Sequence, residues 1–222
     1  MCYSPEADLI AGLVVGAVAV DGFRHVERRS DLALASVPAV LAAHQLIEAA
    51  AWWGLQGRIP SDVGEAAVTA YLAVALGVVP ILVPFAVMRA EENARRRSAM
   101  VPFVGLGAAV SAMLFASMLA EPVGAAIGGR YLAYDVAIIG GSITGLGYVG
   151  ATCVPLLMST SRVLRGFGIV NIPVAAGLSI LLAAGFISLW CVWAAVTSVV
   201  VAVSVRRPYA LHRLSAHATS AG

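Results

Sequence analysis

Long apolar segments, separated by short polar ones, run through the whole chain. Seven of them approach the roughly 20 residues that a helix needs to cross the hydrocarbon core of a bilayer. They cover 7–23, 31–54, 66–88, 101–119, 134–158, 167–184 and 187–205. The pattern predicts an all-α membrane protein, a single helical bundle of about seven transmembrane helices over residues 1–207.

The arginines fall almost entirely in alternate connections between these segments. All 14 basic residues are Arg, and only Arg58 and Arg130 do not follow the first, third, fifth or seventh segment. Because short cytoplasmic loops carry the excess of basic residues, the N-terminus is predicted outside and the C-terminus in the cytoplasm. The tail over 208–222 is expected to be cytoplasmic and disordered.

Composition excludes several other classes of protein. Hydrophobic residues make up 60% of the chain and charged residues 12%, against about 25% charged in soluble domains. A net charge of +2 does not favour nucleic-acid binding. The 3 cysteines are spread along the chain, so they predict neither a disulfide framework nor a CxxC metal site.

Two local motifs predict shape rather than chemistry. The run from Gly145 to Gly150 matches the dinucleotide-binding pattern GxGxxG, but it lies inside a predicted helix and not after a strand. With Gly140 and Gly141 it is expected to let a neighbouring helix approach closely. Prolines 80 and 84 predict a bend in the third helix.

The second predicted helix holds the densest set of polar residues. His44 and Glu48 are four residues apart, so they share one helical face, and Trp52 lies one turn further along it. Gln45 lies about 100° from His44 and faces a neighbouring helix, and Trp53 suits an interfacial anchor. An ionisable side chain inside a membrane costs at least about 2.5 kcal/mol, which makes this stripe a functional hypothesis. The alternative is a structural pair that ties two helices together.

Other polar and aromatic residues fall at the level of Glu48 when the predicted orientation is applied. Glu48 lies about 9 Å inside the outer end of its helix at 1.5 Å per residue. Four or five predicted helices contribute to this outer layer, with Glu6, Asp8, Tyr71, Tyr131, Tyr134, Asp135, Trp190 and Trp193. The layer predicts a pocket in the outer half of the bundle.

The chemistry of such a layer favours reactions that pass through cations. A carboxyl group among apolar side chains tends to remain protonated and can act as a general acid. Aromatic faces stabilise cations by roughly 0.5–2 kcal/mol each. We therefore expect Glu48 to donate a proton to a polyprenyl chain, with Asp135 as a second and Glu6 as a third candidate acid or base. The expected substrate-binding residues are His44, Gln45, Trp52, Trp53, Tyr71, Tyr134 and Trp190.

The opening Met-Cys-Tyr-Ser, together with His44-Gln45-x-x-Glu48-x-x-x-Trp52, resembles a large family of multi-pass prokaryotic membrane proteins. Within it, the chain is most similar to the small integral-membrane terpene cyclases of actinobacterial indole-sesquiterpenoid pathways. The resemblance implies a multi-pass protein of a bacterial plasma membrane that cyclises a farnesylated indole or related meroterpenoid, with Glu48 as the essential acid. The soluble cyclase patterns DDxxD and DxDD are missing from the sequence, so we expect no magnesium and no other cofactor.

Two other functions remain open from the sequence. A metal or haem protein would use Cys2, His25 and His44 as ligands, but the predicted orientation puts His25 on the cytoplasmic side and His44 nearer the outside. A small transporter or scaffold would use Glu48 and Asp135 to carry protons or polar cargo, but the charged residues form one layer without a path to the cytoplasmic face.

Overall fold

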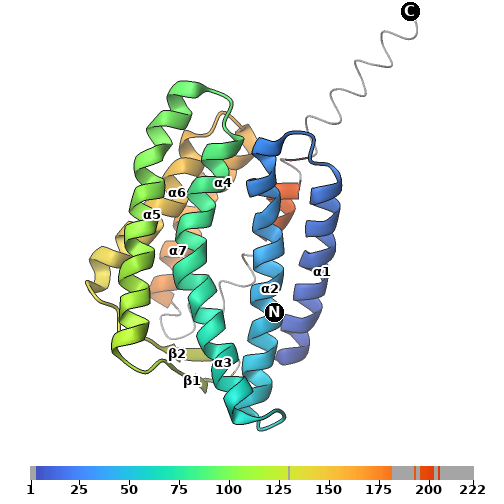
Figure 1. Ribbon diagram of the computed structural model, residues 1–222, viewed down its shortest axis with the longest axis vertical. Helices are drawn as coiled ribbons and strands as arrows, with labels where there is room; N and C mark the ends of the chain where they lie inside the picture. Colours follow the sequence, from blue (N-terminus) through green and yellow to red (C-terminus); the bar gives the residue numbers. More distant parts are fainter. Residues whose placement is uncertain (1–3, 130, 182–192, 194–195, 203–204, 206–222) are drawn as a thin grey trace, which may run out of the picture.

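A computed structural model of the protein describes residues 4–129, 131–181, 193, 196–202 and 205, without the side chains of 175–181. Within these residues the chain is predominantly helical, as predicted, and the helices lie side by side in a bundle (Figure 1). The helices are α1 (Pro5–Arg24), α2 (Leu32–Leu55), α3 (Ser61–Leu72), α4 (Val79–Ala90), α5 (Ala94–Ala120), α6 (Gly141–Met158) and α7 (Arg162–Leu181).

Shorter elements join these helices. A 3-10 turn (Arg29–Asp31) precedes α2, and a π-helical segment (Ala73–Val78) makes α3 and α4 continuous. Strands β1 (Gly124–Ile127) and β2 (Leu132–Asp135) form an antiparallel hairpin between α5 and α6. Residues 196–202 are also helical.

Four helices of the described chain are long and apolar enough to cross a membrane. They cover Arg29–Leu55, Ser61–Ala90, Ala94–Ala120 and Gly141–Met158. The first six apolar segments predicted from the sequence coincide with α1, α2, α3 to α4, α5, α6 and α7, with shifted boundaries. Most of the seventh, 187–205, and the whole tail over 208–222 lie outside the described residues.

The start of the fifth segment was predicted wrongly. Residues 132–135 form β2, and α6 begins only at Gly141. Gly140 and Gly141 have φ angles of 79° and 50°, in the left-handed region that glycine adopts without strain. These two glycines therefore form the turn into α6, and of the two only Gly140 lies against α5, where a Cβ would be 3.1 Å from a Met113 carbon.

The bundle has two distinct ends in Figure 1. The loops 25–31, 91–93 and 159–161 meet at what we call the arginine-rich end. The turn 56–60 and the β-hairpin lie at the opposite, hairpin end. The arginine-rich end carries Arg24, Arg28, Arg29, Arg89, Arg95, Arg96, Arg97, Arg162 and Arg165, and the turn at the hairpin end carries Arg58.

Hydrogen bonds tie the three loops of the arginine-rich end together. The Arg28 guanidinium donates to both carboxylate oxygens of Asp31, each at 2.9 Å, and also to Glu92. Glu91, 3% exposed, accepts from the Thr160 backbone N–H at 2.8 Å and from the Thr160 hydroxyl at 2.7 Å. Arg96 donates to the Met158 carbonyl at 2.8 Å. The loop between α4 and α5 is thereby fastened to both other loops.

The Glu91 carboxyl titrates below its ordinary value. Burial raises its pKa, but hydrogen bonds from the Thr160 backbone and hydroxyl, the Asn93 backbone and the Ser159 hydroxyl lower the pKa by more. The net result is a pKa below 4.5. Glu91 is thus a carboxylate at neutral pH, held by neutral donors rather than by an arginine.

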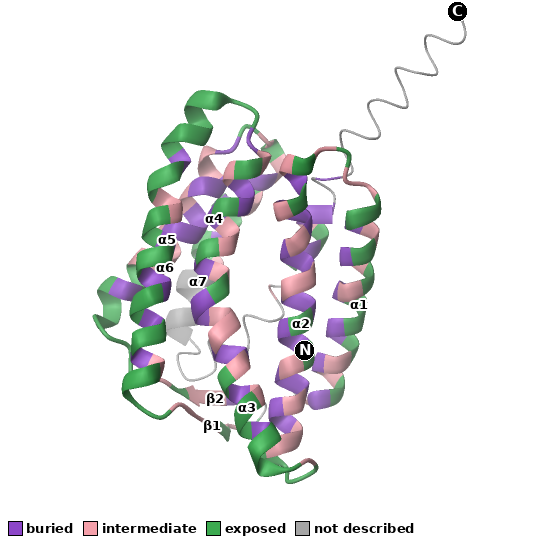
Figure 2. Ribbon diagram, in the orientation of Figure 1, coloured by how far each residue is buried: buried purple, intermediate pink, exposed green. Residues whose placement is uncertain are grey.

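The buried apolar residues separate into two clusters along the bundle. The first occupies the arginine-rich half and includes Leu34, Leu41 and Met100. The second occupies the hairpin half and includes Trp52, Tyr71 and Leu132. Figure 2 shows buried residues along much of α2, whereas α5 is largely exposed. The hairpin half is therefore the aromatic half.

The third predicted helix contains a π-helical segment just before Pro80, and the bend predicted from the prolines stays a prediction. The segment ends directly before Val79 and Pro80, and π turns of this kind insert an extra residue into a helix. The Gly77 carbonyl accepts from the Ser111 hydroxyl at 2.6 Å, and the Ala75 carbonyl accepts from the Tyr148 hydroxyl at 2.9 Å. Side chains of α5 and α6 thus satisfy backbone groups beside the break.

Glycines allow helices to approach closely, as two examples show. A Cβ on Gly54 of α2 would lie 2.4 Å from the Gly64 Cα of α3, so no side chain fits there. Within the GxGxxG run, a Cβ on Gly147 would lie 2.9 Å from a methyl carbon of Val110 on α5. The run lies inside α6, so the prediction that it serves helix packing is confirmed for Gly147.

Candidate functional site

The polar stripe of α2 faces the interior of the bundle. Gln45 and Glu48 are 0% exposed, Trp52 is 3% exposed and His44 is 5% exposed. Burying ionisable groups costs desolvation free energy, so they lie inside a protein only where other interactions offset that cost. The stripe that the sequence singled out is therefore a buried site and not a surface feature.

Three aromatic rings stack beside this stripe. The His44 and Tyr71 rings have centroids 3.9 Å apart and planes 15° apart. The Tyr71 and Tyr134 rings follow at 4.7 Å and 13°. The rings come from α2, α3 and β2, so the hairpin completes a stack that begins on the polar helix.

Two of the polar atoms at this site have no protein partner. Within the described part of the chain, His44 Nε2 and Trp52 Nε1 make no hydrogen bond, although both atoms are buried. A buried polar atom without a partner is costly, so such atoms often face a ligand or water. The site therefore has hydrogen-bonding capacity to offer to a bound molecule.

Asp8, and not Glu6, is the carboxylate that α1 directs inward. Asp8 is 0% exposed, whereas the Glu6 side chain is 62% exposed and pairs with Arg58 at 3.3 Å. Residues two apart on a helix differ by about 200° in direction, so only one of them can face α2. The prediction that Glu6 shares the site of Glu48 is corrected to a surface ion pair.

A pattern in the sequence could have distinguished the two. Asp8, Gly12, Val15 and Ala19 recur at helical spacing, and all are buried against the bundle. Gly12 in particular approaches Leu46 of α2 so closely that a Cβ would lie 2.7 Å from a leucine methyl carbon. A stripe of small residues marks the packed face of a helix, and Asp8 begins that stripe.

Asp135, the predicted second acid, lies on the hairpin and is exposed. Successive side chains of a strand point to opposite faces, so the strand that directs Tyr134 towards Tyr71 turns Asp135 away. The structure does not bring Asp135 together with Glu48. This differs from the prediction because the segment is a strand, whereas a helix was expected.

The remaining tryptophans lie in different surroundings. Trp53 is half-buried near the end of α2, as expected for an anchor, and Trp190 lies outside the described residues. Trp193, expected in the outer layer, stacks on Phe167 of α7 with centroids 5.6 Å apart and donates to the Asn171 side chain. Phe167 and Asn171 belong to the half of α7 that starts at the arginine-rich end, so Trp193 lies deeper than predicted.

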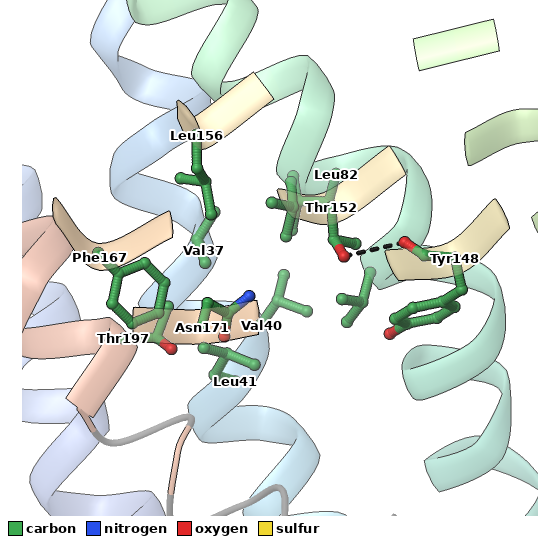
Figure 3. Close-up of a pocket in the computed structure, with 12 residues that line it drawn as sticks. Val37, Val40, Leu41, Leu82, Tyr148, Thr152, Leu156, Phe167, Asn171 and Thr197 are labelled. Atoms are coloured by element: carbon green, nitrogen blue, oxygen red, sulfur yellow. Dashed lines mark hydrogen bonds between the residues drawn. The ribbon is translucent and has the colours of Figure 1, made fainter. Parts of the chain in front are cut away.

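A pocket opens on the arginine-rich side of the stripe (Figure 3). It encloses about 560 Å³ of space, its opening included, between α2, α4, α6 and α7. Val37 and Leu41 of α2 line it, and so do Val83 of α4 and Leu156 of α6. None of the predicted substrate-binding residues lines this pocket, which starts one turn of α2 beyond His44.

The polar side chains around the pocket are occupied by the protein. The Thr152 hydroxyl donates to the Tyr148 carbonyl at 2.9 Å, and the Tyr148 hydroxyl donates to the Ala75 carbonyl. The Asn171 amide donates to Cys153 Sγ at 3.1 Å and accepts from Trp193. The pocket therefore presents an apolar wall.

The two histidines considered as metal or haem ligands, His25 and His44, are not brought together. His25 lies beside Asp21 at the arginine-rich end of α1, and its Nδ1 is 2.8 Å from the Asp21 carbonyl. His44 lies in the hairpin half, and Cys2 lies outside the described residues. Over the described ranges, no three His, Cys, Asp or Glu side chains gather as they would around a metal ion.

Comparison with known proteins gives a family but no activity. Residues 1–216 match the family described as a family of unknown function, DUF6629. No curated protein and no solved structure matches the chain.

Proposed function

The chain belongs to the DUF6629 family of unknown function, and we propose, from its buried site, that it is a membrane-embedded terpene cyclase. It would protonate the prenyl chain of a farnesylated indole or related meroterpenoid and guide the closure of rings. The observation that carries this proposal is a fully buried Glu48 beside the His44, Tyr71 and Tyr134 ring stack.

The chemistry follows from these groups. The Glu48 carboxyl transfers its proton to the terminal alkene or epoxide of the chain, and the cation so formed is captured by the next double bond. Ring faces stabilise the travelling positive charge without acting as nucleophiles. The final cation then loses a proton, which returns to the Glu48 carboxylate directly or through water, so the acid is restored. The product is an isomer of an alkene substrate or, for an epoxide, a cyclised alcohol of the same composition. His44 Nε2 and Trp52 Nε1, which have no hydrogen-bond partner among the described residues, can orient the substrate.

We further propose that the protein crosses a bacterial plasma membrane about seven times, with the N-terminus outside and the C-terminus in the cytoplasm. The clustering of arginines at one end of the bundle supports this orientation. Large apolar side chains on the bundle surface support a lipid environment, among them Leu13 at 61%, Ile143 at 79% and Leu119 at 88% exposed. A substrate with a prenyl chain would reach the site from the bilayer.

The test is turnover by membranes that contain the protein, with a farnesylated indole as substrate and mass spectrometry to detect a cyclised isomer. Replacing Glu48→Gln should lower turnover by about 10²–10⁴-fold, the usual contribution of a general acid. Glu6→Gln is the matched control, because it changes an exposed carboxylate on the same end of the bundle. Retained turnover in Glu48→Gln would refute the assigned acid, and no turnover of any prenylated aromatic would refute the class.

Haem or metal binding is the second candidate, because His44 Nε2 is buried and has no partner in the described residues. Purified protein with stoichiometric haem absorbance or bound metal that is lost in His44→Ala would favour this function over the cyclase. For the small transporter, no contact among the described residues favours that function.

A further inference from the structure

The apolar pocket and the polar stripe follow each other along one face of α2. Val37, Leu41 and Glu48 follow each other at spacings of four and seven residues, which keeps them within about 40° around the helix axis. At 1.5 Å per residue, Leu41 lies about 10 Å and Val37 about 16 Å from Glu48 along the axis. A molecule that reacts at Glu48 can therefore extend along this face into the pocket.

Tyr148 connects the two regions from the opposite side. Its side chain lines the pocket and also packs against the aromatic cluster that contains Tyr71 and Trp52. Its hydroxyl is held by the Ala75 carbonyl in the π-helical segment, which fixes the ring in this position. The border between pocket and stripe is thus a tyrosine ring and a leucine side chain, without a charged group.

The lining of the pocket defines what it can bind. The hydroxyl and amide groups of its polar side chains are bonded within the protein, including Thr197, which donates to the Trp193 carbonyl at 2.9 Å. The hydroxyl donors there are already used, so a polar ligand would lose more of its hydration than the pocket wall replaces. The lining suits an apolar group, because apolar side chains supply most of the pocket wall.

We propose that this pocket binds the part of the substrate remote from the reacting end, and that Val83 and Leu156 set the longest substrate accepted. The proposal rests on the proposed function, because Glu48 fixes where the reacting end lies. Figure 3 shows Leu156 with Val37 and Phe167 at one end of the pocket and Leu41 at the other. The former group lies towards the arginine-rich end, farthest from Glu48.

Substitution of Val83 in the pocket wall should change length selection in both directions. Val83→Phe fills space there and should lower kcat/KM for farnesylindole about tenfold or more, while geranylindole changes little, because the discrimination per added group is of that order. Val83→Ala enlarges the space and should raise kcat/KM for geranylgeranylindole. Val101→Phe, on an exposed face of α5, is the matched control and should leave the ratios unchanged. Unchanged length selection in both Val83 variants would overturn the proposal.

A labelling experiment separates this proposal from the cyclase itself. The Glu48→Gln protein, in nanodiscs, is irradiated with 5-azido-3-farnesylindole, and the labelled peptides are mapped by mass spectrometry. Labels on α4 near Val83 or on α6 near Leu156, reduced in Val83→Phe, support the pocket even where no turnover is detected. Turnover with labels only on lipid-facing residues overturns the pocket and leaves the cyclase standing.

The same pocket could hold a lipid acyl chain, so a second arm uses a phospholipid with a photoreactive acyl chain. Labelling of the pocket residues by the indole probe, undiminished by excess phospholipid, supports substrate binding. Labelling by the phospholipid alone overturns the proposal in favour of a structural lipid.

Discussion

At the arginine-rich end Glu91 is buried among hydrogen-bond donors, whereas in the hairpin half Glu48 is buried beside a stack of rings. Glu91 accepts from Thr160, Ser159 and Asn93, and its role is to join loops. Glu48 shares its helix face with His44 and Trp52, which keep polar atoms without partners in the described chain. The structural carboxylate of Glu91 and the proposed acid Glu48 thus lie in opposite halves of the bundle, in different surroundings.

The first way to sharpen this contrast is to disturb the packing of the hairpin half. Gly54→Ala places a Cβ 2.4 Å from the Gly64 backbone and should destabilise the protein by about 3 kcal/mol, because two helices must separate. Thermal unfolding of the purified protein measures this. Gly105→Ala, where no atom lies within 4 Å, is the control and should stay within about 0.5 kcal/mol. Equal stability of the two variants would contradict the backbone contact.

The second prediction concerns the hydrogen bonds by which Glu91 joins the loops of the arginine-rich end. Glu91→Ala removes the acceptor of the Thr160 backbone and hydroxyl groups and should cost about 2 kcal/mol in unfolding free energy. Glu92→Ala, which removes only an exposed pair with Arg28, should cost at most about 1 kcal/mol. The turnover of folded Glu91→Ala protein should equal that of the native chain. A selective loss of turnover would break the separation of the two ends.

The third prediction concerns the ring stack. Tyr134→Leu keeps apolar volume on the hairpin but removes the stacking on Tyr71, which is worth about 0.5–1.5 kcal/mol. Tyr134→Phe keeps the stack and should behave like the native protein. The two variants are compared by thermal unfolding and by kcat/KM. If Phe is as damaging as Leu, the hydroxyl rather than the ring is what the site uses.

The smallest effect is the dependence of stability on pH. The Glu91 pKa is lowered from 4.5 in the folded protein, so its carboxylate contributes stability above pH 4.5 and loses that contribution as the pH falls through the folded pKa. Unfolding temperature followed over this acid range should fall more steeply for the native protein than for Glu91→Gln. If the two curves are parallel, the hydrogen bonds to Glu91 do not stabilise its carboxylate over its protonated form.

Hydropathy predicted the long helices because a bilayer-spanning segment leaves little choice of structure. It could not predict the hairpin, since an apolar segment as short as the one around Leu132 suits a buried strand as well as a helix. The turn into α6 depended on the left-handed Gly140 and Gly141, which the sequence suggested as packing residues.

The part of the candidate site that lies on α2 was predicted from the sequence. The spacing of His44 and Glu48 placed them on one face, and their burial agrees with that prediction. Whether Asp8 or Glu6 faces α2 depends on how α1 is rotated about its own axis. The positions of the two carboxylates in the sequence do not by themselves give that rotation. The pocket is formed by side chains from four helices, so no single segment of the sequence contained it.

The contact between Glu91 and Thr160 also has a consequence for synthesis of the chain. The two residues are 69 positions apart, and chains elongate at about 5–20 residues per second, so Thr160 follows Glu91 after roughly 3–14 s. During that interval the first five helices exist without the partner of their acidic loop. The arginine-rich end can therefore form its contacts with Glu91 only after α6 and the loop behind it have been made.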